Sequence, residues 1–565
     1  MSITIAELRK AVRTAQDRGA AANTLGLALA EMNERAQALK YFQLAAKLQP
    51  EQARYYNNCA QASLSLNRPE AAIRYYEASL KLAPNQTEAC YNLALIYADR
   101  LKAPDESKRM FERSIKNSPE HLMSYVSLCF LLVADQSAEE ARQNVFNLLG
   151  SSAKPLNVHK GMARALIKYG RYEEARQEHL LALAVGPDEA DTLYWLGETE
   201  LGLRRVDAAT RYYRKAYEIA PKHYWARTNY LQQLIRLGDC KAAQMVYRSY
   251  VASNRIEPPS GDSSLNAVPE WTGSSLQGKT ILVINDIGDG DAIHFTRFAS
   301  LLKRAGATVI VECRKSLKSA IRTMPGVDMV LSKFEKSPLI DYHCRPAFSS
   351  LLFDWTWETI GNQIPYINPP SHIRRKWRER LAGDSCLRVG LNWEGSLKSR
   401  NNAYTRCRIP FEQLGPISEV PGVTLYSLQF GAGAEALRDG PGRFNIRDLN
   451  VGDYLDTAGA VQALDLIITV DTSLSHLAGA LGKPCFLMLP FLSCWRWMLD
   501  REDTPWYPST RLFRQSQPGN WADVISRVCQ ATCSLASHKT TEGEALPLRR
   551  TESETNFGTR QIRLS

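Results

Sequence analysis

Prolines recur at a nearly constant spacing through the first 221 residues, and this period constrains the fold more than any other feature of the chain. Successive members lie 32 to 36 residues apart, at Pro50, Pro84, Pro119, Pro155, Pro187 and Pro221. A proline removes a backbone donor and ends a helix, so the period predicts a repeated unit that closes at a helix end. A period of about 34 residues accommodates two helices per unit. We therefore predict an array of stacked helix pairs.

Small and aromatic residues keep step with the prolines. Pro50 and Pro221 are preceded, at the same offsets, by Gly26, Ala38, Phe42 and Ala45 and by Gly197, Ala209, Tyr213 and Ala216. Small residues let two helices approach closely, and the aromatic ring fills the gap. With the period, this pattern is the tetratricopeptide-repeat signature, and it predicts an α-solenoid of about six to seven repeats over residues 1–255. The units ending at Pro119 and Pro155 match poorly, and residues 222–252 are predicted to be a terminal cap.

Solenoids of this kind bind extended peptides or partner proteins on their concave face. Four asparagines stand at polar positions on the first helices of units: Asn57, Asn58, Asn92 and Asn229. An asparagine can bond a peptide backbone without reading its sequence. We therefore predict that these residues bind a protein acceptor; the alternative is that they are ordinary exposed polar residues.

The second half alternates strand-like and helix-like segments. Apolar runs typical of buried strands occupy residues 279–286, 307–313, 327–332, 387–393, 423–429, 464–470 and 484–490. Such alternation predicts parallel sheets. Two successive sets predict two Rossmann-like lobes, at residues 278–383 and 384–535, with ligands at the carboxyl ends of the strands. Sugar kinases and periplasmic-type binding proteins also have two such lobes, so the fold alone does not define the function.

Polar segments bound these parts. Residues 256–277 are rich in Pro, Ser, Gly and Asp and are predicted to be a linker. Residues 536–565 are polar and unpatterned and are predicted to be a disordered tail.

The composition narrows the partners and the compartment. Lys and Arg outnumber Asp and Glu by 70 to 59, and this mild excess favours an anionic ligand but, without a dense basic stripe, not nucleic acid. Twelve scattered cysteines without a CxxC pair fit a reducing compartment. The first residues lack the apolar core of a signal peptide, and no apolar run approaches the length of a membrane span. The chain is therefore predicted to be cytoplasmic.

A glycine-rich turn follows the first strand of the second half. The segment INDIGDGDAIHF places Asp291 at the start of a helix, where a carboxylate that faces the cleft can accept a proton from an attacking group. The alternative is a helix cap. His294, one turn later, is a second candidate base or a lining residue.

A second polar turn follows the strand at 464–470. Asp471, Thr472 and Ser473 lie between that strand and a helix, and His476 follows within one turn. The first N–H groups of a helix lack partners and carry partial positive charge, so they can bind a pyrophosphate with these side chains as further donors. Asp471 is alternatively a ligand of sugar or ribose hydroxyls. The other interpretation is an N-cap with a core histidine.

These segments resemble a known family. The residues that carry the resemblance are GKTILVINDIGDGDAIHFTRF, LRVGLNWEGS, PGVTLYSLQ, DTAGAVQALDLIITVDTSLSHLAGALGKP and WRWMLDREDTPWYPSTRLFRQ. They are similar to bacterial tetratricopeptide-repeat glycosyltransferases, whose C-terminal halves are similar to the ADP-heptose:lipopolysaccharide heptosyltransferases of GT-B fold. The arrangement also resembles the flagellin glycosyltransferases of alphaproteobacteria and, more distantly, the O-GlcNAc transferases.

The resemblance implies roles for individual residues. It assigns Asp291 to the base region, and the donor contacts to Asp471, Thr472, Ser473, His476, Ser427, Gln429, Asp456 and Thr457. It implies a nucleotide-sugar co-substrate without metal or other cofactor, because helix dipoles and basic side chains offset the leaving diphosphate. Lys398, Arg406 and Arg408 are the candidate cations.

One segment departs from the family pattern. Relatives carry WxGNPxHxNDRxRSIP, whereas this chain has WEGSLKSRNNAYTRCRIP. Glu394 replaces a small residue and Cys407 replaces an arginine, for which Arg406 or Arg408 is the candidate substitute.

Four aromatic residues follow the last strand-like run: Trp495, Trp497, Trp506 and Tyr507. Packing is the favoured role, with sugar or acceptor stacking as the alternative. Arg501, Arg511 and Arg514 are predicted to brace this block.

The sequence thus predicts a protein glycosyltransferase. The repeats would hold a protein acceptor, for which the resemblance suggests flagellin, and the GT-B half would transfer a sugar from a nucleotide donor. Two alternatives remain open: a non-catalytic repeat scaffold with a degenerate transferase half, and a lipopolysaccharide-core glycosyltransferase.

Overall fold

The computed structural model of the chain describes residues 5–253, 268–285, 288–332, 338–395, 407–439, 444–499 and 501–542. The chain divides into two compact units, Met1–Arg205 and Val206–Ser565. The candidate cations Lys398 and Arg406 lie outside the described residues.

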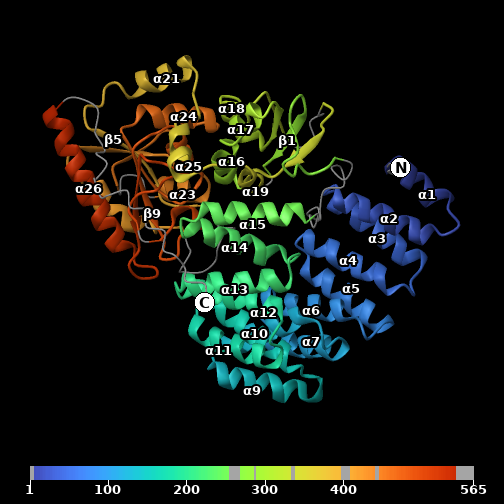
Figure 1. Cartoon of the computed structure of the whole chain (residues 1–565). Helices are drawn as coiled ribbons and strands as arrows, with labels where there is room; N and C mark the ends of the chain where they lie inside the picture. The colour runs from blue at the N-terminus through green and yellow to red at the C-terminus, as the bar shows by residue number, and fades with distance from the viewer. Residues whose placement is uncertain are drawn as a thin grey trace. The chain divides into compact units, whose positions relative to one another are not determined.

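The first unit is built from helices. They are α1 (Ile5–Thr14), α2 (Arg18–Glu31), α3 (Arg35–Leu48), α4 (Ala53–Ser65), α5 (Pro69–Leu82), α6 (Thr87–Asp99), α7 (Pro104–Asn117), α8 (Leu122–Val133), α9 (Ala138–Leu149), the 3₁₀ turn η1 (Gly150–Ser152), α10 (Pro155–Lys168), α11 (Tyr172–Val185) and α12 (Ala190–Gly202). Neighbouring helices pair along the array, as the period predicts (Figure 1). A Cβ at Gly26 would lie 2.5 Å from the Phe42 ring, so the small residue makes room for the aromatic one.

The repeating prolines end helices, with one exception. Pro50, Pro84 and Pro119 each lie two residues beyond a helix end, after α3, α5 and α7. Pro155 instead is the first residue of α10, a position where the missing N–H costs nothing. The prediction that Pro155 ends a helix is therefore wrong.

The second unit begins with three helices, α13 (Val206–Ile219), α14 (Tyr224–Arg236) and α15 (Cys240–Ala252). α14 and α15 pack on the sheet-containing part of the unit (Figure 1). Arg236 donates to the Ser493 carbonyl at 3.2 Å, and Gln244 donates to the Trp355 carbonyl at 2.8 Å. The compact division thus falls after Arg205, earlier than the end of the predicted solenoid at residue 255.

Residues 268–277, the described part of the predicted linker, form a backbone hydrogen bond with a strand of the first lobe. The Trp271 backbone N–H donates to the His343 carbonyl at 2.8 Å, and the Trp271 side chain is buried. Residues 254–267 lie outside the described part.

The first lobe contains a four-stranded parallel sheet of order β3-β2-β1-β4. The strands are β1 (Thr280–Ile284), β2 (Thr308–Glu312), β3 (Met329–Leu331) and β4 (Tyr342–Cys344). The helical segments are α16 (Asp289–Thr296), α17 (Ala299–Arg304), η3 (Lys315–Leu317), α18 (Lys318–Ile321), α19 (Pro346–Ser349), η4 (Ser350–Leu352), α20 (Trp357–Ile360), η5 (Gly361–Gln363) and α21 (Ser371–Leu381).

The second lobe contains a six-stranded parallel sheet of order β10-β9-β8-β5-β6-β7. The strands are β5 (Leu387–Asn392), β6 (Val423–Ser427), β7 (Ile446–Asp448), β8 (Leu466–Val470), β9 (Cys485–Leu489) and β10 (Thr510–Arg514). The helical segments are η6 (Phe411–Leu414), α22 (Gly415–Ser418), α23 (Ala432–Asp439), α24 (Tyr454–Ala463), α25 (Ser473–Ala480), η7 (Trp495–Trp497) and α26 (Trp521–Glu542). This is the doubly wound Rossmann order, with its switch point between β5 and β8.

The predicted fold class is confirmed: a helical repeat array precedes a pair of Rossmann-like lobes. All seven predicted strands are present, and β4, β7 and β10 are additional. Helix α26 extends through residues 536–542, which the sequence pattern assigned to the tail, and residues 543–565 lie outside the described part. Among the described helices, none combines the length and apolarity that a membrane crossing requires.

Candidate functional site

The candidate site begins at the switch point of the second sheet, where doubly wound folds bind ligands. β5 ends at Asn392, whose Oδ1 accepts hydrogen bonds from Thr469 Oγ1 at 3.0 Å and Thr472 Oγ1 at 3.1 Å. These bonds tie the carboxyl end of β5 to the end of β8 and to the start of α25.

Gln429 organises the same edge. Its Oε1 accepts from Asn392 Nδ2 at 2.9 Å and from the backbone N–H groups of Trp393 and Glu394, both at 3.0 Å. Its Nε2 donates to the Glu394 carbonyl at 3.1 Å and to a second carbonyl at 2.9 Å. Ser427 Oγ accepts the Gln429 N–H at 3.3 Å. Both predicted nucleotide contacts thus support the turn after β5.

The hydroxyls at the start of α25 make contacts within the protein. Thr472 is the N-cap, and its Oγ1 accepts the Leu474 N–H at 3.3 Å. Ser473 Oγ lies 2.8 Å from the Tyr454 hydroxyl. Asp471, Thr472 and Ser473 are all partly exposed. Thr472 therefore caps α25, as the second interpretation predicted, and all three polar residues lie partly exposed at the edge of the sheet.

The glycine-rich turn of the first lobe meets the start of α25. A Cβ at Gly290 would lie 2.8 Å from His476 Cδ2 and 3.2 Å from Ser473 Cα. Only a residue without a side chain allows this approach between α16 and α25. The two motifs singled out in the sequence, 183 residues apart at Gly290 and Ser473, are thereby brought together.

Asp289 adds a second connection between the lobes. Its Oδ1 accepts from Arg314 Nη1 at 3.0 Å, and its Oδ2 lies 3.1 Å from the Tyr454 hydroxyl. Since the same hydroxyl contacts Ser473, Tyr454 bridges the starts of α16 and α25. Sequence reasoning missed this tyrosine.

Asp291 lies at the start of α16 and forms an ion pair with Arg496 from η7 of the other lobe. The Asp291 side chain is 32% exposed, and that of Arg496 is 11% exposed. The carboxylate therefore lies in the contact between the lobes and retains access to solvent.

His294 and His476 are interior residues. Their Nδ1 atoms lie 2.9 Å and 3.0 Å from the hydroxyl of buried Tyr507. Burial, reinforced by the positive charges of Arg297 and Arg496, holds the pKa of each histidine well below its usual value. Both rings are therefore neutral members of the inter-lobe core. This environment favours the lining role over the base role for His294, and the core role over phosphate binding for His476.

Arg408 is the one predicted cation within the described residues. Its Nε lies 3.1 Å from Oε1 of Glu394, whose side chain is buried. Glu394, which replaces a small residue of the family pattern, thus offsets the positive charge of Arg408, the predicted phosphate ligand.

Asp456 and Thr457 stabilise helix packing. Asp456 Oδ1 accepts from Lys376 Nζ at 2.6 Å and Trp377 Nε1 at 2.8 Å. Burial raises the pKa of Asp456, but its hydrogen bonds outweigh burial and lower it below the usual value. Thr457 is buried and donates to the Asp453 carbonyl at 2.9 Å. These contacts hold α24 together and attach it to α21.

The four asparagines lie on α4, α6 and α14, and their role in acceptor binding stays a prediction. Asn57 and Asn58 each donate, at 2.6 Å, to a side-chain oxygen of a neighbouring repeat. Asn92 lies on α6 and is partly buried. Asn229 lies on α14, in the second compact unit.

The aromatic block packs, as predicted. Trp495, Trp497, Trp506 and Tyr507 are buried. Arg514 donates to Ser493 Oγ at 2.6 Å and to a backbone carbonyl of the block, while Arg501 and Arg511 form ion pairs beside it.

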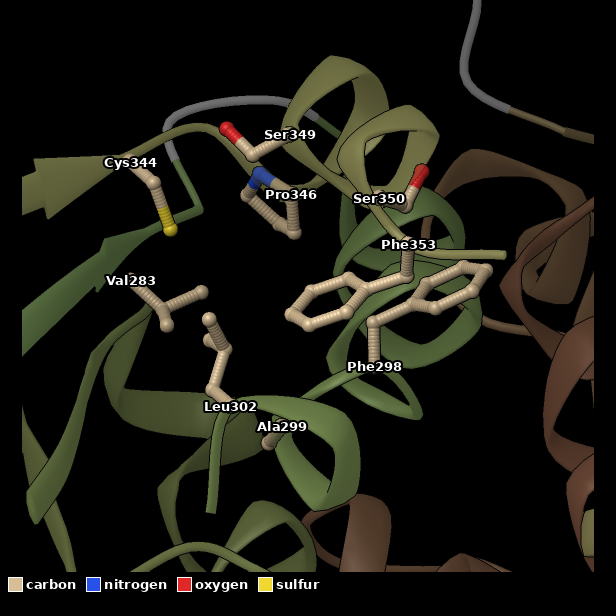
Figure 2. Close-up of a pocket in the computed structure, with 9 residues that line it drawn as sticks. All are labelled: Val283, Phe298, Ala299, Leu302, Cys344, Pro346, Ser349, Ser350 and Phe353. Carbon is tan, nitrogen blue, oxygen red and sulfur yellow. The ribbon is translucent and has the colours of Figure 1, made fainter. Parts of the chain in front are cut away.

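A small cavity lies inside the first lobe, away from these motifs. Figure 2 shows Val283, Leu302 and Cys344 around it, beside the rings of Phe298 and Phe353. Its volume of about 10 Å³ holds roughly one water molecule. It is therefore too small for a nucleotide or sugar.

The first half of the chain carries tetratricopeptide repeats. The models of this repeat family match residues 23–87 and 161–224, and residues 87–121. The last match includes the unit ending at Pro119, so the prediction that this unit departs from the pattern is wrong. Pro155 lies outside the matched residues.

A curated relative is protein FlbA of Caulobacter vibrioides, which is 28% identical over 378 residues, 60% of this chain and 60% of that protein. The chain thus spans about 60% of the length of this relative.

Two solved structures are similar in part. One is a family 9 glycosyl transferase from Veillonella parvula, with 14% identity and a TM-score of 0.33, covering 47% of this chain and 99% of that chain. The other is YrrB, a TPR protein with an unusual peptide-binding site, with 16% identity and a TM-score of 0.22, covering 40% of this chain and 97% of that chain.

Proposed function

We propose that this protein is a GT-B glycosyltransferase that moves a sugar from a nucleotide donor to a protein held by the tetratricopeptide repeats. One observation carries the proposal: Gly290 lets the turn that holds Asp291 meet the start of α25 beside the switch point of the donor lobe. This contact supports the proposal because it brings the turn that holds Asp291 in one lobe close to the polar start of α25 in the other.

In the proposed reaction an acceptor hydroxyl attacks the anomeric carbon of the donor sugar. The bond from the sugar to the phosphate oxygen breaks, and the nucleotide leaves with the electron pair. Asp291 accepts the proton of the attacking hydroxyl. The positive end of α25 and nearby basic side chains offset the charge that develops on the leaving phosphate. A bound sugar and its acceptor are oriented by the two lobes, so the reaction becomes effectively intramolecular.

The repeats support a protein acceptor. Helical repeat arrays present an extended surface that suits peptides and folded partners, whereas a short glycolipid does not require one. The resemblance to flagellin glycosyltransferases makes flagellin the first acceptor to examine.

A non-catalytic scaffold is the second candidate, and specific contacts favour it. Asp291 is engaged by Arg496, Thr472 caps its own helix, and Arg408 is neutralised by Glu394. A decayed transferase half would retain such internal contacts while lacking donor binding.

Intact-mass analysis separates the candidates. Proteins that co-purify with this chain are identified first. The masses of these proteins, of flagellin and of lipopolysaccharide are then compared between cells with and without the protein. We expect sugar-sized mass increments on flagellin or on a co-purified protein only in cells that contain it. Unchanged protein masses together with a shortened lipopolysaccharide core in cells without the protein would identify a lipopolysaccharide-core glycosyltransferase. No mass change in any sample would favour the non-catalytic scaffold.

A further inference from the structure

Arg496 is enclosed between the two lobes. Its guanidinium lies 4.5 Å from the Trp495 ring centroid and 5.1 Å from that of Phe295, and its Nη1 lies 2.9 Å from Cys494 Sγ. The aromatic rings hold the guanidinium in place and exclude most of the surrounding water. Charge interactions of such a group are stronger than those of an exposed arginine.

Carboxylates from both lobes act on this guanidinium. Asp291 forms an ion pair with it, and Asp471 interacts with it through charge. Burial lowers the pKa of Arg496, but the interactions with Asp291, Cys494 and Asp471, in that order, outweigh burial and hold it above its usual value. Within the described residues, Arg496 Nε has no hydrogen-bond partner. One donor of the fork is thus unused.

The ion pair occupies one carboxylate oxygen of the side chain that the proposed function requires. Asp291 Oδ1 is engaged by Arg496 and is not available to an acceptor hydroxyl. A guanidinium binds phosphate through two parallel hydrogen bonds. A phosphate beside Asp471 would therefore compete with Asp291 for Arg496.

We propose that Arg496 is a donor-sensing residue, paired with Asp291 in the empty site and transferred to the donor phosphate when the nucleotide sugar binds. This inference rests on the proposed function and adds an order to it. No covalent bond changes in the exchange: the guanidinium leaves one anion for another, and Asp291 becomes free to accept the acceptor proton. The donor must therefore be bound before Asp291 accepts the proton of the acceptor hydroxyl.

The exchange predicts an unusual affinity pattern. Asp291→Asn removes the competing anion and should tighten nucleotide binding about tenfold, since a charge-assisted hydrogen bond corresponds to roughly that factor or more. Arg496→Gln should weaken binding about tenfold or more for the same reason. In the double variant, Asp291→Asn should have no further effect, because it acts only through Arg496.

Calorimetric titration of the full-length protein with ADP, GDP, UDP and CMP in turn tests this pattern. Arg511→Gln is the matched control, because it changes the same side chain in an exposed ion pair with Glu502. Arg496→Lys keeps the charge if Arg496→Gln does not fold, and it should bind more weakly than the wild type, because an ammonium group cannot form the two parallel hydrogen bonds. Thermal unfolding of each variant reports whether it is folded.

The outcomes separate the inference from the function beneath it. If a nucleotide binds the wild type and Asp291→Asn binds it equally or more weakly, donor sensing is overturned and the transferase proposal stands. Equal tightening by Asp291→Asn with and without Arg496 also overturns it, because general charge repulsion then explains the effect. If none of the four nucleotides binds the wild type, the proposed function fails together with the inference.

Discussion

Gly290 controls how closely the two predicted motifs approach. Its backbone lies against His476 and Ser473, where a methyl group would be 2.8 Å from a ring atom and 3.2 Å from a backbone atom. Neither neighbour can move easily, because His476 is buried against Tyr507 and Ser473 begins a helix.

Gly290→Ala is therefore expected to destabilise the second unit by about 1–3 kcal/mol, the usual cost of overpacking a well-packed site. Denaturant unfolding measures this. Gly383→Ala is the matched control, because nothing lies within 4 Å of an added methyl group there. If both alanine variants were equally stable, the contact between α16 and α25 would not be as described.

The residues of this contact were only partly accessible from the sequence. Asp291, Asp471, Thr472 and Ser473 follow strands, and the carboxyl ends of parallel strands meet at one edge. Arg496 could not be found in this way, because it pairs with a residue 205 positions away and lies among tryptophans that indicate packing. The histidines are the opposite case. Their positions in the sequence suggested a base and a phosphate ligand, and only the fold shows that both rings are buried beside the Tyr507 hydroxyl.

At the level of elements, α14 and α15 belong to the sheet-containing unit. Trp357 Nε1 donates to the Gly238 carbonyl at 2.6 Å between these helices, and Arg248 donates to the Leu352 carbonyl at 3.0 Å. Buried residues of α14 and α15 join the core of the first lobe.

We therefore expect residues 206–565 to unfold cooperatively when produced alone, whereas residues 256–565 should lack a cooperative transition because the removed helices leave apolar surface exposed. Thermal unfolding followed by near-ultraviolet circular dichroism compares the two. A cooperative transition in the shorter protein would show that α13, α14 and α15 are dispensable additions.

The elements missed by sequence reasoning are short or charged. β4 and β7 have three residues each, and β10 reads TRLFR, with an arginine at its second and fifth positions. These strands lie at the edges of their sheets, where burial on both faces is not required. The predicted strands other than β3 are central, and central parallel strands form continuous apolar runs, whereas β3 is an edge strand whose apolar run was nevertheless recognisable.

Across the whole molecule, both units bury neutral histidines. Burial lowers the pKa of His179 in the first unit to about 3, and those of His294 and His476 in the second unit well below the usual value. Because the unfolded chain takes up protons on these rings near pH 6.5 and the folded protein does not, stability is full above pH 6.5 and falls as the pH decreases.

Each such histidine should contribute a slope of about 1.4 kcal/mol per pH unit below that point. Unfolding free energies measured between pH 7 and pH 5 test this for His179→Leu, which should have a shallower slope than the wild type. His372→Gln replaces an exposed histidine and should leave the slope unchanged. A wild-type stability that does not change over this range would contradict the burial of the three rings.

The measurement that tests the transferase account most directly is the intact mass of flagellin and co-purified proteins from cells that carry either wild-type protein or Asp291→Asn. Asp503→Asn serves as the control, because it changes an exposed aspartate paired with Arg501 in the same lobe as Arg496. We predict that the sugar-sized increment is present with the wild type and with Asp503→Asn and is absent with Asp291→Asn, although all three proteins accumulate and fold equally. An undiminished increment with Asp291→Asn would contradict the account.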